Sequence, residues 1–133
     1  MIAALPHTAV YASLCTLLIV VLLLLVVRLR RKLKVGIGDG GHRDLARAIR
    51  VHANAIESVP LFLILLAIYE HNGGGAVLLN AFGSVFLIAR IAHAAGMLRT
   101  AGASLGRVAG TAGSIACLVG LAVANLARVI GLF

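Results

Sequence analysis

Long runs of uncharged, apolar residues dominate this sequence and constrain its fold more than any other feature. No Asp, Glu, Lys or Arg occurs in Ile2 to Val27, Gly73 to Ala89 or Val108 to Ala127. A further apolar run, Val51 to Ile68, carries only one charged residue, Glu57. Because a bilayer core about 30 Å thick is crossed by roughly 20 apolar residues in a helix, the sequence predicts four membrane-spanning helices.

The composition excludes an ordinary soluble domain. Hydrophobic residues make up 62% of the 133-residue chain, and charged residues make up 12%, against about 25% in a typical soluble protein. The first apolar run is not a secretory signal, because signal peptides place their basic residues before a short apolar core. Here the basic residues follow a longer run, which we therefore interpret as a transmembrane helix.

The spacing of the runs predicts a single domain over residues 1–133. We expect helices over residues 8–34, 42–71, 76–97 and 105–131, and no segment shows the alternation of a strand. Short connections make sequential helices antiparallel neighbours. The predicted fold class is all-α, an integral membrane four-helix bundle with up-down-up-down topology.

Glycines are concentrated in two segments, the first connection and the start of the fourth helix. Gly36, Gly38 and Gly41 match a dinucleotide-binding spacing, but that motif requires a preceding strand, so we interpret the segment as a tight turn. Small residues also recur every three or four positions near the start of the fourth helix, which predicts close helix packing. They are Gly102, Gly106, Gly110, Gly113 and Ser114.

The positive charge is concentrated in one connection. The net charge is +8, and eight of the 12 Lys and Arg residues lie between positions 28 and 50. The third connection holds Arg99 and Arg107, whereas the second holds none. By the positive-inside rule the first and third connections are cytoplasmic and both termini are periplasmic if the membrane is a bacterial inner membrane. The basic run suits anionic membrane lipid, and we expect no nucleic-acid partner.

The two cysteines are predicted to be reduced packing residues. Cys15 and Cys117 lie inside apolar runs, far apart in sequence and without the spacing of metal ligands. Thiols in such surroundings behave as small hydrophobic side chains. We therefore expect neither a disulfide framework nor a metal site.

A polar stripe enters the second apolar run. At 100° per residue, Arg43, Arg47, Arg50, Asn54 and Glu57 fall within about 80° of one another. Glu57 lies about 10 Å deeper than Arg50 along the helix. A lone carboxylate at that depth costs a few kcal/mol, so Glu57 must pair internally, contact a ligand or be protonated.

Polar residues of the third and fourth helices belong to the same membrane layer. Arg90 and His93 are separated by three positions, and Arg107 opens the fourth helix. Antiparallel packing of neighbouring helices gathers these residues near the cytoplasmic boundary. The layer consists of Arg50, Asn54, Glu57, Arg90, His93 and Arg107.

Two interpretations of this layer are open. The first is an internal salt-bridge network, such as Glu57 with Arg90, that only holds the bundle together. The second is a binding pocket, because several arginines face one carboxylate and the excess positive charge favours an anionic ligand. Carboxylates would meet the arginines and an ammonium would meet Glu57, a charge pattern that glutathione has. His52 lies off the stripe and is either an interfacial histidine or a ligand contact.

Two motifs resemble a known family. The pattern R-x-H-x-N-x-x-E in "RVHANAIE", with a basic run before it and Pro60 after it, resembles the second helix of the MAPEG family. These are membrane-associated proteins in eicosanoid and glutathione metabolism. The segment "ARIAH", residues 89–93, is similar to the third-helix motif of the family's microsomal glutathione transferases. Length, helix number and basic loops agree, so the resemblance covers nearly the whole chain.

The resemblance implies a homotrimer that binds glutathione between subunits near the cytoplasmic face. It also implies a thiolate that attacks a lipophilic electrophile or a lipid hydroperoxide, which is transferase or peroxidase chemistry in a bacterial member. Arg107 is the residue expected to stabilise the thiolate. Where many members carry a tyrosine seven residues after the third-helix arginine, this chain has Met97. The residues implied to hold glutathione are Arg50, His52, Asn54, Glu57, Arg90 and His93.

Two other functions remain open at the level of sequence. A small four-helix transporter would use Glu57 as its intramembrane coupling charge, although such a protein needs no dense arginine cluster. A binding member of the family would keep the pocket without turnover.

Overall fold

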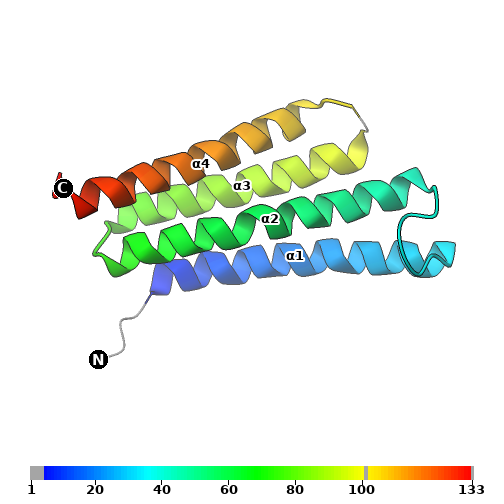
Figure 1. Ribbon diagram of the computed structural model, residues 1–133, viewed down its shortest axis with the longest axis horizontal. Coiled ribbons are helices and arrows are strands. Elements are labelled where there is room, and N and C mark those ends of the chain that lie inside the picture. Colours follow the sequence, from blue (N-terminus) through cyan, green and yellow to red (C-terminus); the bar gives the residue numbers. More distant parts are fainter. Residues whose placement is uncertain (1–4, 101, 133) are drawn as a thin grey trace.

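Four long helices make up the computed structural model, which describes residues 5–100 and 102–132. They are α1 (Pro6–Leu33), α2 (Arg43–His71), α3 (Ala76–Arg99) and α4 (Leu105–Val129), and each is long and apolar enough to cross a membrane. Sequential helices run antiparallel (Figure 1), and the described residues contain no strand. The predicted all-α four-helix fold is confirmed.

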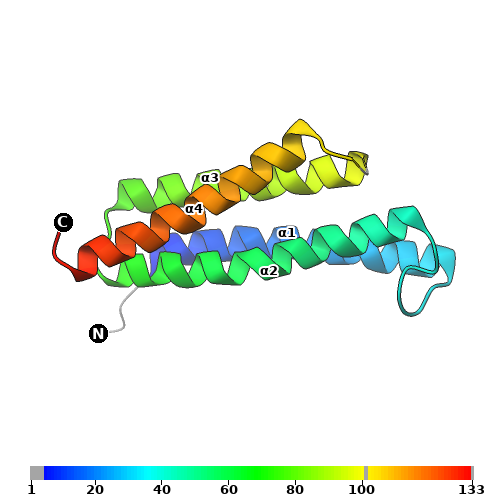
Figure 2. The same ribbon diagram turned by 45° about the horizontal axis from the view of Figure 1, so that its top comes forward.

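The bundle has two chemically different ends. The start of α1, the end of α4 and the α2–α3 turn lie together at what we call the terminal end, and the other two connections form the basic end (Figure 1). Helix α2 contacts all three other helices, whereas α1 and α4 do not touch within the described residues. Figure 2 shows that α4 starts beside α3 and crosses obliquely, so that its last turns reach α2. A site between α2, α3 and α4 is therefore lined by residues of all three helices.

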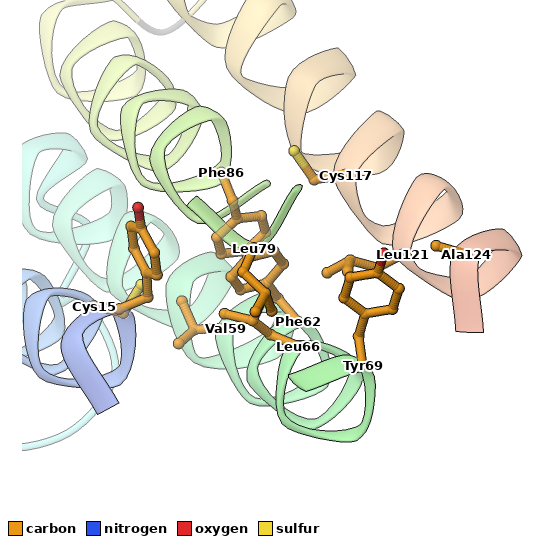
Figure 3. Close-up of a cluster of buried hydrophobic side chains, with 11 residues drawn as sticks. Cys15, Val59, Phe62, Leu66, Tyr69, Leu79, Phe86, Cys117, Leu121 and Ala124 are labelled. Carbon is orange, nitrogen blue, oxygen red and sulfur yellow. The ribbon is translucent and has the colours of Figure 1, made fainter. Parts of the chain in front are cut away.

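The largest cluster of buried apolar side chains draws on all four helices (Figure 3). Phe62 of α2 and Phe86 of α3 stack with their ring centroids 3.8 Å apart. Cys15 and Cys117 belong to this cluster and are free and buried, which confirms their prediction as packing residues. A smaller cluster that includes Met97 continues the core toward the basic end.

The small residues at the start of α4 bring it unusually close to α3. A β-carbon at Gly110 would lie 2.5 Å from the Ala89 carbonyl oxygen and 2.6 Å from the His93 backbone nitrogen. Gly96 and Gly106 face each other in the same way across the helix pair. Small side chains allow such approach where packing, rather than the hydrophobic effect, drives association in lipid. The α4 backbone is consequently placed next to His93.

The α1–α2 connection folds around one arginine. The guanidinium of Arg30 donates hydrogen bonds to the carbonyl oxygens of Val35 (3.4 Å), Gly36 (3.2 Å) and Gly38 (2.9 Å). Gly38 has a φ of +66°, which glycine adopts without the steric penalty of a side chain. The segment with the dinucleotide-like spacing is therefore a compact turn, as the sequence predicts.

A carboxylate from α2 caps the beginning of α1 at the terminal end. The two carboxylate oxygens of Glu70 accept the backbone N–H groups of His7 (3.0 Å) and Thr8 (2.7 Å). The first N–H groups of a helix have no partner within the helix and carry partial positive charge. Nearby, the Tyr11 hydroxyl bonds to the Asn80 carbonyl oxygen at 3.0 Å and to the Ser84 hydroxyl at 2.9 Å. These bonds fasten α1 to α2 and α3.

Candidate functional site

A polar cavity of about 280 Å³ lies between α2, α3 and α4, between the core cluster and the basic end. Apolar side chains, Leu61, Ile115 and Leu118, form part of its wall. The remaining wall is polar, which is unusual among membrane-spanning helices. The polar lining residues are Asn54, Glu57, Ser58, Arg90, His93, Thr111 and Ser114.

Arg90 is a buried cation in this wall. Its side chain is only 6% exposed, and it donates to the Ser58 hydroxyl at 2.7 Å and more weakly to the Asn54 carbonyl oxygen at 3.5 Å. Both partners are neutral, and within the described residues no carboxylate forms an ion pair with it. Burying a charge without a counter-ion costs several kcal/mol. The cavity therefore favours an anionic ligand.

His93 contacts α4 through Nδ1 of its imidazole ring. Its Nδ1 lies 3.3 Å from the Arg107 carbonyl oxygen and 3.0 Å from the Thr111 hydroxyl oxygen. A carbonyl oxygen can only accept, and the Thr111 hydroxyl already donates to that same oxygen at 2.8 Å. A proton on Nδ1 satisfies these contacts together, with Nε2 as the acceptor 3.4 Å from the Asn54 amide nitrogen. The imidazole links α2, α3 and α4 around the cavity.

Glu57 pairs along its own helix rather than across the bundle. Its Oε1 lies 3.6 Å from Arg50 Nη1, and the two side chains are 58% and 63% exposed. The internal pair of Glu57 with Arg90, which was one of the two interpretations left open by the sequence, does not form. Arg90 instead donates to Ser58, and Arg50 extends along α2 to meet the carboxylate. Glu57 and Arg50 thus form an outward-facing rim, and Glu57 also lines the cavity.

Three candidate residues do not line this cavity: Arg50, Arg107 and His52. Arg107 lines a neighbouring cavity of about 550 Å³ that also includes Thr111 and Ile115, two residues that the cavities share. His52 is half-buried, and among the described residues it lines neither cavity and has no side-chain hydrogen bond. The structure thus brings Asn54, Glu57, Arg90 and His93 together, sets Arg50 and Arg107 beside them and leaves His52 apart.

Three hydroxyl residues of the cavity were missed by the sequence interpretation. Ser58 follows Asn54 by four positions, and its hydroxyl is the strongest hydrogen-bond partner of Arg90. Thr111 and Ser114 follow Arg107 by four and seven positions, so helical periodicity puts them on one face with it. That periodicity was available in the sequence, but serine and threonine are common in membrane helices, and Ser114 was interpreted only as a small packing residue.

Met97 also contacts the cavity wall. It is buried, and its sulfur accepts a hydrogen bond from the Asn54 amide nitrogen at 3.4 Å. A thioether is a weak acceptor. Asn54 therefore contacts Met97, His93 and, through its backbone oxygen, Arg90.

Comparison with known proteins agrees with the resemblance seen in the motifs. The MAPEG family model matches residues 8–127. Proteins named "Inner membrane protein YecN" from Escherichia coli strains K12 and O6:H1 are 38% identical over 86 residues, which is 65% of this chain. The match spans 66% of those relatives, slightly less than two thirds of their length. Because the family model covers nearly the whole chain, this protein belongs to the MAPEG family.

Proposed function

We propose that this protein is a membrane-bound glutathione-dependent transferase or peroxidase that binds glutathione at the Arg90 cavity. The observation that carries the proposal is the buried guanidinium of Arg90, whose partners are neutral oxygens at the wall of a polar cavity. Membership of the family supports glutathione as the anion that balances this charge. Glutathione would supply the reacting thiol.

The charges around the cavity match those of glutathione. The guanidinium groups of Arg90 and Arg50 would bind its two carboxylates, because arginine matches carboxylate geometry with paired N–H donors. The carboxylate of Glu57 would bind its ammonium group. Asn54 and His93 would add neutral hydrogen bonds from the cavity wall.

The outward position of the rim supports a site shared between subunits. Arg50 and Glu57 are more than half exposed in one chain, and charged groups at membrane depth are seldom left facing lipid. A homotrimer, as in the family, would cover this rim with a neighbouring subunit and complete the glutathione site. His52, which does not line the cavity of its own chain, would then be available to a neighbour.

Arg107 is proposed to stabilise the thiolate. A thiol with a pKa of about 8.5 is only a few per cent ionised at pH 7. A nearby guanidinium that lowers the thiol pKa by about two, worth roughly 2.7 kcal/mol, would leave most of it ionised. An arginine does not accept the released proton, which leaves to water. Part of the gain is lost because thiolates of lower pKa are weaker nucleophiles.

Co-localisation is the larger contribution expected to catalysis. The cavity that holds Arg107 is otherwise lined mainly by apolar residues, including Val108, Ala112 and Ile115. A lipophilic electrophile or lipid hydroperoxide dissolved in the bilayer would enter here, beside Thr111, which both cavities share. Holding two reactants together in this way converts a bimolecular step into an effectively unimolecular one.

The expected location is a bacterial inner membrane with the basic end in the cytoplasm. The relatives named "Inner membrane protein YecN" support the compartment. The positive-inside rule supports the orientation, because the basic residues gather at one end of the bundle. Glutathione would then reach the site from the cytoplasm.

The role of Arg107 is tested by ultraviolet absorbance of the thiolate when glutathione is added to purified protein. We expect the signal in the unmodified protein and its loss in Arg107→Ala, with the oligomer intact. Arg99→Ala is the matched control, because Arg99 ends α3 at the same end but lines neither cavity. An unchanged signal in Arg107→Ala would show that Arg107 does not stabilise the thiolate.

Turnover separates an enzyme from a binding member or a transporter. An enzyme should join glutathione to a generic aromatic electrophile, with loss of the leaving group. Binding without turnover would reduce the proposal to a glutathione-binding protein. Proton-coupled flux in liposomes, without glutathione binding, would replace it with transport.

A further inference from the structure

A second polar cavity lies at the basic end, away from the proposed glutathione site. Its volume is about 180 Å³, and it is enclosed by the last turns of α1 and the first turn of α2. Lys32 and Arg43 provide two cations, and Leu29 and Leu33 provide an apolar floor. None of these residues takes part in the proposed glutathione chemistry. His42 and Asp44 complete the wall.

The cavity has a net positive charge because two cations and one carboxylate line it. Asp44 forms an ion pair with Arg47, which lies outside the cavity. In the part of the chain that the structure describes, neither Lys32 nor Arg43 forms an ion pair with a carboxylate. An anion entering the cavity would therefore meet two cations free to bind it.

The exposed residues of α1 are apolar along most of the helix and cationic near its end. Leu17, Val21 and Leu24 are 62%, 62% and 60% exposed, and helical periodicity continues their stripe into Arg28 and Arg31. The stripe is thus apolar along the membrane-spanning part and cationic where α1 leaves it. An acyl chain followed by a charged headgroup is complementary to this order.

The α1–α2 turn carries an apolar side chain into the same region. Ile37 is 92% exposed, although the turn around it is fixed by the hydrogen bonds of Arg30 to three carbonyl oxygens. Because this turn joins the last turn of α1 to the first turn of α2 at the basic end, Ile37 is placed to enter the lipid headgroup layer.

We propose that the cavity at the basic end binds the phosphodiester headgroup of an anionic membrane lipid. Lys32 and Arg43 contact the phosphate, and Leu29 and Leu33 contact the glycerol and the first methylenes. The acyl chains follow the edge of the α1 stripe that ends at Lys32, where helical periodicity places the exposed Val21 within about 20° of it. Basic pockets between membrane helices bind acidic headgroups by the same chemistry. The proposal does not depend on the glutathione site.

Lipid retention measured by native mass spectrometry tests the proposal. Full-length protein purified in detergent is titrated with phosphatidylglycerol or, in a separate arm, with zwitterionic phosphatidylcholine of the same acyl chains. We expect preferential retention of phosphatidylglycerol. The double variant Lys32→Gln, Arg43→Gln should bind it about 30-fold more weakly, from about fivefold for each cation lost near the surface.

Arg99→Gln is the matched control, since it removes an exposed arginine at the same end without touching the cavity. Equal retention of the two lipids by the unmodified protein would overturn the proposal, as would a double variant no weaker than the control. A third arm adds inorganic phosphate. Displacement of phosphatidylglycerol by equimolar phosphate would assign the cavity to a soluble anion instead of a lipid.

Discussion

Polar side chains at the two ends of the bundle differ in the partners that they have. At the terminal end, Glu70 accepts two backbone N–H groups of α1, and Tyr11 bonds to the carbonyl oxygen of Asn80. Toward the basic end, Arg90 is as buried as a core residue, yet its partners are a hydroxyl and a distant carbonyl oxygen. The Arg90 cluster, in addition, opens into a cavity of about 280 Å³.

This difference separates polar groups that stabilise the bundle from polar groups that we propose bind a ligand. A carboxylate on the N-terminal N–H groups of a helix gains charge-assisted hydrogen bonds and a favourable helix dipole. A buried guanidinium without a counter-ion reduces stability until an anion arrives. We therefore expect substitutions at the terminal end to change stability, and substitutions around Arg90 to change glutathione binding.

Arg90→Met should give the largest effect on binding. Removing a buried charge that contacts a ligand costs about 2–5 kcal/mol, so glutathione affinity should fall about 30-fold or more. The stability of the ligand-free protein should stay the same or rise, since an apolar side chain replaces an uncompensated charge. Titration calorimetry and thermal unfolding in detergent measure the two effects. A large loss of stability with unchanged affinity would show that Arg90 is structural.

Glu70→Ala should reverse that pattern. The α1 N–H groups of His7 and Thr8 lose their charged acceptor, which we expect to lower the free energy of unfolding by about 2 kcal/mol. Glu70→Gln should recover part of the loss, because an amide oxygen still accepts one hydrogen bond. Glutathione affinity should not change in either variant. A marked loss of affinity in Glu70→Ala would mean that the two ends are coupled.

Thr111→Val is expected to have a moderate effect on glutathione binding. It removes the hydroxyl that contacts His93 Nδ1, while nearly preserving side-chain shape. The loss of one part-buried hydrogen bond is worth about 1 kcal/mol, or about fivefold in affinity. Thr111→Ser keeps the hydroxyl and serves as the control. Equal affinities of the two variants would show that this hydrogen bond does not contribute to glutathione binding.

Met97→Leu should have the smallest effect. Leucine and methionine have similar volumes, and their exchange in a core usually costs less than about 1.5 kcal/mol. The lost contact from Asn54 to sulfur is a weak hydrogen bond, so we expect glutathione affinity to change no more than about twofold. A change of tenfold would show that Met97 does more than fill space.

The fold could be predicted from the sequence because the relevant signal is long and local. Four apolar runs require four helices in lipid, and short connections make neighbours antiparallel. The glycine spacing of α4 also predicted close packing, which the structure assigns to α3 at Gly96, Gly106 and Gly110. The cap on α1 was not predicted, because Glu70 is separated by 62 residues from Thr8.

The candidate site was predicted less completely because side-chain direction decides its details. Helix topology alone anticipated that Asn54 and Arg90 lie at one level of the bundle. It did not anticipate that Arg50 would reach Glu57, or that Ser58 would bind Arg90. Those contacts depend on rotamers and on the small separation of α3 and α4, neither of which is visible in a residue pattern.

The central claim is that an uncompensated buried cation makes the Arg90 cavity a site for glutathione carboxylates. The most direct test is titration calorimetry of the purified protein with glutathione and with its diethyl ester, in which both carboxylates are neutral. We predict saturable binding of glutathione and little or no binding of the diester. No binding of glutathione, or equal binding of both compounds, would contradict the account.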